Sequence, residues 1–131
     1  MERTAVNPWP WSVQLGFDQA QLIEDHRRVL ICSGQDAVDA SGSPQHPGDM
    51  AAQIALAADN LEAVLAGAGM SLADVVRLNI YTTDVDSLFQ HFTILTERFA
   101  GTGERFASTV LGVARLAAPQ LLVLLEATAM D

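Results

Sequence analysis

The sequence predicts one α+β domain over residues 1–131, built on a mixed sheet of about six strands with two helices on one face. Three observations lead to this prediction. Apolar residues recur at helical spacing in two stretches, and they alternate with polar residues at strand spacing in others. The helical stretches are separated by one strand and flanked by more, an order that combines parallel crossovers with antiparallel neighbours.

The N-terminal third is expected to be extended. Residues 1–11 contain the series Asn-Pro-Trp-Pro-Trp, which is turn-prone and is not expected to be helical, so we expect an ordered arm or a strand lead-in. Short apolar segments at 13–17 and 28–33 predict two strands. Residues 36–47 hold the glycines, prolines and short polar side chains of a loop.

Two helices and three strands are predicted in the rest of the chain. The first helix is capped at Asp49 and runs to about Ala68. A capping box at 71–74 opens one short turn before a strand at 76–82, whose odd-numbered residues form a polar face. The second helix is expected from Ser87 to Ala100, where two glycines stop it. The final strands are expected over 107–113 and 121–130.

The last predicted strand bears on assembly. Residues 121–125 are apolar at every position, so both faces of this strand need burial. Two helices form a single layer and can cover only one face of the sheet. Together with the positive mean hydropathy, this pattern predicts an oligomer that buries sheet against sheet.

Composition excludes several functions. Seven basic residues against sixteen acidic ones give a net charge of -9 with no basic block, so nucleic acid is not an expected partner. The single cysteine, Cys32, is interpreted as a small buried hydrophobe in a reducing compartment, with a pocket thiol as the alternative. The sequence shows neither a signal-peptide pattern nor a run long enough to span a bilayer, so a soluble, cytoplasmic protein without a membrane partner is expected.

Cofactor chemistry is also limited. All seven basic residues are arginines, so no side chain can form a Schiff base with a carbonyl substrate or with pyridoxal phosphate. The glycines form no phosphate-loop or dinucleotide pattern, and no pair of histidines has metal-ligand spacing. The sequence therefore predicts neither a cofactor nor a metal site.

Four stretches, in order and at matching separations, resemble one protein family. They are Gly16-Phe-Asp-Gln-Ala20, Val29 to Ser33-Gly-Gln35, the helix of 49–69 with its Gln and Asn-Leu, and Ser108 to Leu116 followed by 124–129. On these residues the chain is similar to the Rid family, also called YjgF or reactive intermediate deaminase, over nearly its whole length. The resemblance implies a fold like chorismate mutase, a homotrimer, and hydrolysis of reactive enamines and imines in a pocket between subunits.

The resemblance also implies an altered pocket. Active members of the family hold the substrate carboxylate with an arginine and position the attacking water with a glutamate. Alignment on residues 113–116 puts the arginine's place at Ser108, and the register of Glu126-Ala127 puts the glutamate's at Leu124. The pocket tyrosine corresponds to Phe17, and the pocket asparagine to about Phe92. Each replacement removes charge or hydrogen-bonding capacity. We therefore expect a drier pocket that binds acidic substrates about 10- to 100-fold more weakly.

The predicted site combines these positions with a turn that matches the family. Ser108 and Gln35, with ordered water, are the predicted catalytic residues. The predicted substrate-binding residues are Phe17, Ser33, Gly34, Gln35, Phe92, Ser108 and Leu124. Arg105 is expected to be a poor substitute for the missing arginine, because an offset of three residues in a strand turns a side chain to the opposite face.

For several side chains the sequence supports two interpretations. A nucleophilic Ser108 would need a base, and the histidine placed for this is His91, whose default is an exposed helix position. Glu126 lies in an apolar strand, and pairing with Arg115 or Arg77 is favoured over catalysis. Both tryptophans, at positions 9 and 11, are expected to pack the arm onto the sheet, with capping of the pocket or of a subunit seam as the alternative.

The predicted function is a homotrimer that binds a small, mostly apolar metabolite at its subunit interfaces. The first hypothesis is an enzyme that acts on an imine, an enamine or a related reactive metabolite other than the usual acidic enamines. The second is a non-catalytic metabolite-binding or regulatory protein. Ribonuclease activity is least supported, because the acidic chain has neither a basic groove nor a histidine pair for acid-base catalysis.

Overall fold

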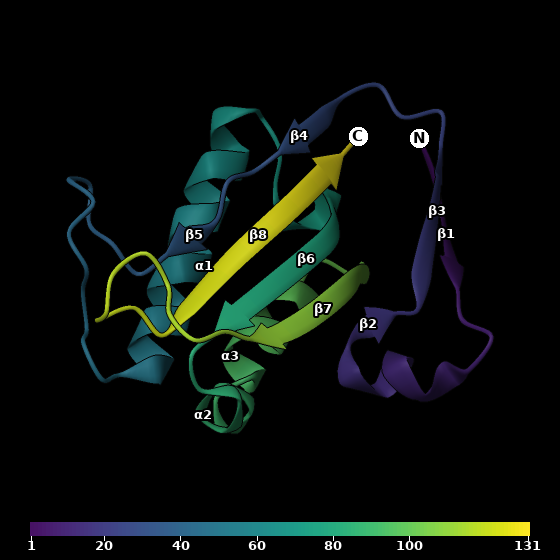
Figure 1. Ribbon diagram of the computed structural model, residues 1–131. Coiled ribbons are helices and arrows are strands. Elements are labelled where there is room, and N and C mark those ends of the chain that lie inside the picture. The colour runs from purple at the N-terminus through teal and green to yellow at the C-terminus, as the bar shows by residue number, and fades with distance from the viewer.

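A six-stranded mixed sheet with helices on one face forms the centre of the computed structural model, which describes residues 1–131 (Figure 1). The strands run in the order β2-β7-β6-β8-β4, and β5 also pairs with β8. Their bounds are β2 Phe17–Asp18, β4 Val29–Ile31, β5 Gln35–Asp36, β6 Val75–Thr82, β7 Phe106–Gly112 and β8 Val123–Met130. β6 is parallel to β7 and antiparallel to β8, which confirms the mixed sheet and the α+β class.

The first predicted helix is confirmed as α1, Met50–Gly67. The Asp49 side chain accepts a hydrogen bond from the Ala52 N–H, as an N-cap does. Its apolar stripe is buried against the sheet, at Ile54, Ala58, Leu61 and Leu65. The capping box of Ser71 and Asp74 is also present, and it starts a short 3-10 turn that leads into β6.

The second predicted helix is wrong as one continuous element. The chain forms α2, Val85–Gln90, and then α3, Thr93–Ala100. At the break, the His91 N–H bonds to the Leu88 carbonyl three residues back, and the His91 Nδ1 lies 2.9 Å from the Ser87 carbonyl oxygen. The His91 ring thus contacts the Ser87 carbonyl, which in a continuous α-helix would accept a hydrogen bond from the His91 backbone N–H. The helix therefore ends here, and the chain turns before Phe92.

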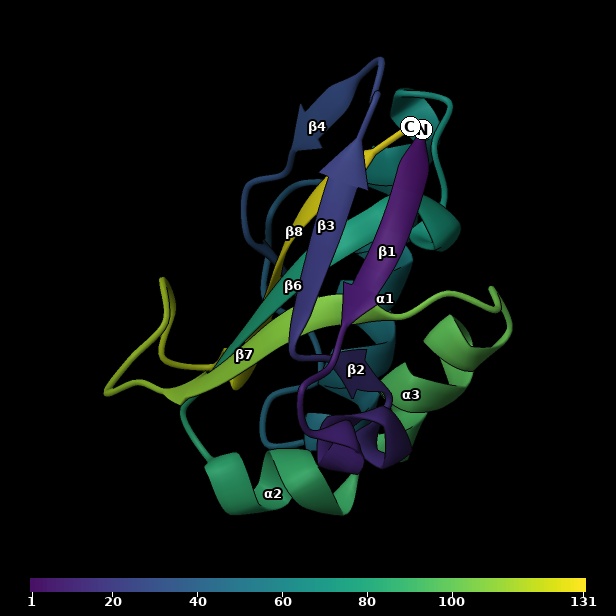
Figure 2. The same cartoon turned by 90° about the vertical axis from the view of Figure 1, so that its right-hand side faces the viewer.

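The N-terminal region also departs from the prediction. The expected strand at 13–17 is wrong, because Pro10–Leu15 form a 3-10 helix that ends at Gly16 with φ of 91°. Proline suits the first position of such a turn, since its φ is already fixed there. The expected arm is a strand, β1 Glu2–Val6, and it pairs with β3 Ala20–Glu24, which was not predicted. Figure 2 shows this two-stranded ribbon beside the main sheet.

A buried arginine attaches the ribbon to the sheet. Arg3 donates to the carbonyl oxygens of Ala73 at 2.7 Å and Val75 at 2.6 Å, and to Gln21 Oε1 at 2.7 Å. It also bonds the Arg105 carbonyl. Burial lowers the pKa of the Arg3 guanidinium despite the acidic groups nearby. One side chain therefore connects β1 and β3 with the starts of β6 and β7.

Only one face of the main sheet is covered. Along β8 the side chains of Val123, Leu125, Ala127 and Ala129 are buried beneath the helices, whereas the residues between them are only half-buried. Figure 1 shows the helices behind the sheet and the front of β6 and β8 open. The second apolar face inferred from residues 121–125 therefore stays uncovered within one chain, and oligomerisation stays a prediction. None of the helices combines the length and apolar character that a bilayer crossing requires.

Candidate functional site

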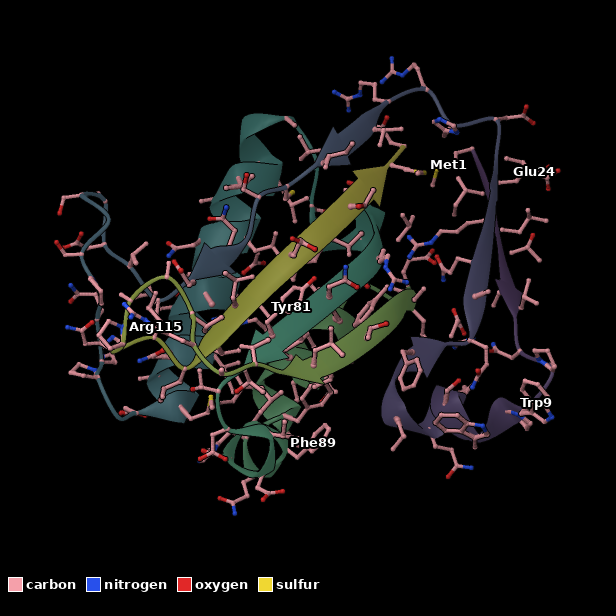
Figure 3. The ribbon with its side chains drawn as sticks, viewed as in Figure 1. Met1, Trp9, Glu24, Tyr81, Phe89 and Arg115 are labelled. Atoms are coloured by element: carbon pink, nitrogen blue, oxygen red, sulfur yellow. The ribbon has the colours of Figure 1, made fainter.

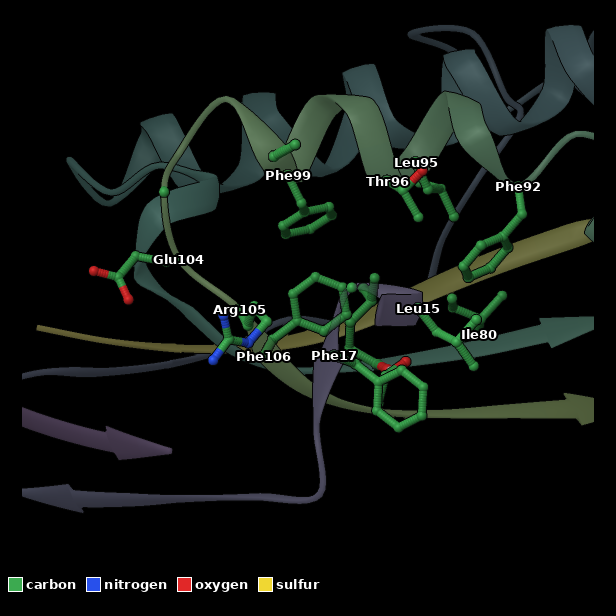
Figure 4. A pocket seen from close by; sticks show the side chains of 15 residues that line it. Leu15, Phe17, Ile80, Phe92, Leu95, Thr96, Phe99, Glu104, Arg105 and Phe106 are labelled. Atoms are coloured by element: carbon green, nitrogen blue, oxygen red, sulfur yellow. The ribbon is translucent and has the colours of Figure 1, made fainter. Parts of the chain in front are cut away.

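A cavity of about 250 Å³ lies between α3 and β7, on the helix side of the sheet (Figure 4). Three of the predicted site residues line it: Phe17, Phe92 and Ser108. The rest of the wall is mainly apolar and includes Leu15, Ile80, Leu95, Phe99 and Phe106. The structure therefore brings Phe17, Phe92 and Ser108 together around one cavity, as predicted.

Three elements position these side chains. Phe17 starts β2 directly after Gly16, whose positive φ turns the chain out of the 3-10 helix and onto the edge of β7. Phe92 lies at the break between α2 and α3, so its ring points toward the sheet (Figure 4). Ser108 lies on β7 opposite Leu78, whose side chain is fully buried on the same face.

The Ser108 hydroxyl has a structural partner and no base. Its Oγ donates to the Leu78 carbonyl oxygen at 2.8 Å. No histidine lines the cavity, and the ring of His91 is turned to the Ser87 carbonyl instead. A serine without a base in hydrogen-bond reach is not activated as a nucleophile. Its lone pairs can still accept one hydrogen bond from a ligand or a water.

Arg105 corrects an expectation from strand geometry. The side chain was expected on the face opposite Ser108, yet it lines the same cavity. The reason is that β7 begins at Phe106, so Arg105 lies in the turn before the strand, where the alternation of faces does not apply. Its Nε donates to Asp18 Oδ1 at 2.7 Å, and Figure 4 places it at the edge of the cavity.

Asp18 balances the charge of Arg105. Its side chain is 2% exposed and also accepts hydrogen bonds from Asn7 and Gln21, each at 2.8 Å. Burial raises the pKa of Asp18, but the hydrogen bonds from Asn7, Arg105 and Gln21 together hold it below its ordinary value. Glu104 adds a second carboxylate among the lining residues, and Figure 4 shows it turned away from the aromatic rings. The cavity thus has no uncompensated positive charge for an anionic ligand.

The other predicted residues lie at the opposite edge of the sheet. Ser33, Gly34 and Gln35 lead into β5, which pairs with β8 at Leu125. Gly34 packs directly on Leu124, because a Cβ at residue 34 would collide with that side chain. In the sheet, β6 and β8 stand between Gln35 and β7, and β6 stands between Leu124, on β8, and β7. One chain therefore does not bring Gln35 and Leu124 together with Ser108.

Glu126 forms a network that differs from the predicted one. Its carboxylate accepts hydrogen bonds from Asn79 Nδ2 at 3.2 Å and from the Tyr81 hydroxyl at 3.1 Å. The expected ion pairs with Arg115 and Arg77 are absent, because these arginines do not reach it. The hydrogen bond to Glu126 raises the pKa of Tyr81. Structural pairing was thus the right interpretation, with the wrong partners.

Cys32 lies on the core side and lines none of the cavities described for this chain. It is 5% exposed, and burial raises the pKa of its thiol. This favours the buried-hydrophobe interpretation. No group of three or more His, Cys, Asp or Glu side chains is arranged to hold a metal ion.

Sequence reasoning missed residues that the fold brings to the cavity. Leu15 was placed in a strand, and the Asp18–Arg105 pair joins residues far apart in the chain. The pairing of β2 with β7 is what brings Asp18 to Ala107 and so to Arg105. No local spacing carries that information.

Comparisons with known proteins agree with the fold and the order of motifs. A family model described as endoribonuclease L-PSP matches residues 17–131. The chain is 31% identical to the RutC family protein YjgH of Escherichia coli, over 76% of each. Among solved structures it resembles the Rid protein YyfB of Yersinia pestis, with 34% identity and a TM-score of 0.88 over 100% of both chains. It also resembles Rv2704 of Mycobacterium tuberculosis, with 28% identity and a TM-score of 0.67, over 99% of this chain and 100% of that one.

Proposed function

The chain belongs to the endoribonuclease L-PSP family, which includes the Rid and YjgF proteins, and from this we propose that it binds a small uncharged metabolite and hydrolyses an imine or enamine of it. The observation that carries the proposal is the apolar cavity beside α3, which Ser108 lines. The motif alignment assigns Ser108 to the place of the family's carboxylate-binding arginine. Arg105, the nearby cation, is already paired with Asp18.

The charge of the cavity favours an uncharged ligand. A carboxylate placed beside Phe17 and Phe92 would lose its hydration and find no free cation. An uncharged imine avoids that cost and gains from burial of its apolar groups. We therefore expect the chain to prefer uncharged imines to the acidic enamines that active members of the family hydrolyse.

An enamine first gains a proton on carbon and loses one from nitrogen, which converts it to the imine. Hydrolysis then requires water to add to the carbon of the C=N bond. The adduct then loses ammonia and leaves a carbonyl compound, so the step consumes one water and needs no cofactor. The Ser108 oxygen is placed to accept a hydrogen bond from the imine N–H or from that water. Gln35 is assigned the role of orienting the water.

We assign the complete site to two copies of the chain. Ser108 lies on β7 and Gln35 on β5, with β6 and β8 between these two strands, which supports a pocket shared between neighbouring copies. The open sheet face and the exposed Ile31, which has 80% of its surface accessible, provide apolar area for such contacts. A homotrimer would hold three such pockets.

Non-catalytic binding is the second candidate function. The hydroxyl of Ser108 is engaged by Leu78, and the one carboxylate that lines the cavity, Glu104, is 52% exposed and turned away from the rings. A metabolite-binding or regulatory protein needs no base in the pocket. RNA cleavage, which the family description names, is disfavoured here because a net charge of -9 opposes contact with a phosphate backbone.

The test compares two freshly generated enamines, one with a carboxylate and one an uncharged analogue, using the wild-type chain and Ser108→Arg. We expect wild type to accelerate hydrolysis of the uncharged enamine, and the variant to gain at least about tenfold on the acid. Rapid hydrolysis of the acid by wild type would contradict the proposal. If wild type binds the uncharged analogue but hydrolyses neither enamine, non-catalytic binding replaces hydrolysis as the function.

A further inference from the structure

A second hollow of about 440 Å³ adjoins the cavity beside Ser108. The two share the lining residues Leu15, Phe17, Phe92 and Ser108. The second hollow adds Trp11, Phe89 and Val110, and we call this part the aromatic groove. Neither the family position of Ser108 nor the proposed hydrolysis accounts for it.

Two aromatic pairs and one strand residue line the aromatic groove. Trp11 contacts Phe17 edge-to-face, with ring centroids 5.9 Å apart and planes at 83°. Phe89 contacts Phe92 in the same way, at 5.8 Å and 64°. Val110 of β7 also lines the groove. The lining is therefore dominated by aromatic rings.

In the single chain these side chains expose apolar area to water, which is unfavourable, and a ligand in the groove would bury that area. Trp11 is 54% exposed, Phe89 55% and Leu15 56%. The only polar side-chain groups of the groove are the Ser108 hydroxyl and the Trp11 indole N–H, and neither is charged. A charged or strongly polar substituent would find no partner there, whereas an aromatic ring would bury apolar area on both sides.

We propose that the aromatic groove holds an aryl group of the ligand, joined to the reactive carbon that lies beside Ser108. The inference rests on the proposed function and names its substrate class as uncharged imines or enamines with an aromatic substituent. Trp11 and Phe89 are then specificity-determining residues. The position of the groove favours a small molecule as the occupant, because it shares four lining residues with the cavity in which the reactive group is placed.

The test measures binding without turnover, by calorimetry with 2-naphthylacetamide and with acetamide as the matched probe that lacks the ring. We expect the naphthyl probe to bind at least about 100-fold more tightly. Trp11→Ala and Phe89→Ala should each weaken its binding by about tenfold. Trp9→Ala is the matched control, because Trp9 is 64% exposed, adjacent in sequence and outside the groove. Its affinity should equal that of wild type.

Three results would overturn the inference. The first is a naphthyl probe that binds no more tightly than acetamide. The second is an equal loss of affinity in Trp9→Ala and Trp11→Ala, which would indicate a general effect of the N-terminal segment. The third is a change of oligomeric mass in Phe89→Ala with unchanged probe affinity, which would make the groove an interface between copies of the chain.

Failure of the inference and failure of the proposed function give different results. A protein that binds the naphthyl probe but hydrolyses no imine retains the aromatic groove as a binding site and rejects hydrolysis. A protein that hydrolyses small and aryl imines equally well, with unchanged rates in Trp11→Ala, retains hydrolysis and rejects the groove. Val110→Trp provides a second check, since it fills the groove without altering the exposed rings.

Discussion

Asp18 is the residue that decides the charge of the candidate site. It lies on β2 and accepts hydrogen bonds from Asn7, Gln21 and Arg105. Asn7 follows β1, Gln21 lies in β3, and Arg105 precedes β7. A buried carboxylate with this many donors stays ionised and fixes the side chains around it. The same interactions that neutralise Arg105 therefore hold the ribbon and the start of β7 in place.

Substitution of Asp18 by Asn should lower stability and change its pH dependence. The pKa of Asp18 is lower in the folded chain than in the unfolded chain, so the ionised group stabilises the fold at neutral pH. That stabilisation is lost as the pH falls below about 4 and through the lowered folded-state pKa. Because Arg105 is 41% exposed, we expect a loss of only about 1–3 kcal/mol at pH 7.

Urea denaturation of wild type and Asp18→Asn at pH 7 and pH 3 measures this effect. The difference between the two proteins should shrink at pH 3, because the Asp18 carboxyl of the unfolded wild-type chain is then largely protonated, which favours unfolding. Glu97→Gln serves as the control, since Glu97 is exposed and makes no ion pair. A difference that is the same at both pH values would contradict the assignment of Asp18 as a charged, stabilising partner.

At the scale of single residues, the sequence predicted which side chains line the cavity better than it predicted their orientations and hydrogen-bond partners. The placement of Phe17, Phe92 and Ser108 around one cavity agrees with the motif alignment. The orientation of Arg105 was wrong because strand alternation was applied to a residue in the turn before β7, where it does not hold. The partners of Glu126 were wrong because Asn79, and not Arg77, lies opposite it on β6, in a register that no local pattern specifies.

At the scale of elements, capping residues and apolar periodicity predicted correctly where helices and turns begin, because both signals are local in the sequence. Asp49 and the capping box at 71–74 set the starts of α1 and of the turn before β6 as predicted. The break at His91 was not visible, because the apolar stripe continues across it through Leu88 and Leu95. The ribbon was missed because β1 and β3 are mostly exposed and lack a strong apolar alternation.

The packing of the turn before β5 on β8 gives an element-scale prediction. Gly34→Ala should cost about 1–3 kcal/mol, because the new Cβ would collide with the Leu124 side chain. Leu124→Ala removes the obstacle, so the same change at Gly34 should cost much less in that background. Thermal or urea unfolding of the double-mutant cycle measures this coupling. If the two substitutions have additive effects on the free energy of unfolding, the contact between residue 34 and Leu124 does not constrain the turn before β5.

At the scale of the whole molecule, the open sheet face and the divided site point to the same arrangement. The half-buried residues of β8 that face away from the helices include Leu124 and Glu126. Ser108 lies on β7 and Gln35 on β5, and β6 and β8 stand between these two strands. An assembly that covers the open face can also bring one copy's Gln35 to another copy's Ser108, which a single chain does not achieve.

Mixing two variants tests this arrangement. Ser108→Trp fills the cavity in one chain, and Gln35→Ala removes the predicted water-orienting group in the other, so each protein alone should lose hydrolysis of an uncharged imine. After co-refolding of an equal mixture, about a quarter of the interfaces should contain both intact halves and regain activity. Light scattering should report the mass of a trimer throughout. A mixture that stays inactive, or a monomer at micromolar concentration, would contradict the shared site.

The central claim is that this site selects an uncharged ligand because its one nearby cation is neutralised by Asp18. The most direct measurement is the ratio of kcat/KM values of the wild-type chain for an uncharged enamine and for its carboxylate-bearing analogue. The account predicts a ratio of at least about ten in favour of the uncharged enamine. A preference for the acid would contradict it, and would mean that an arginine of this chain or of a neighbouring copy is free to hold a carboxylate.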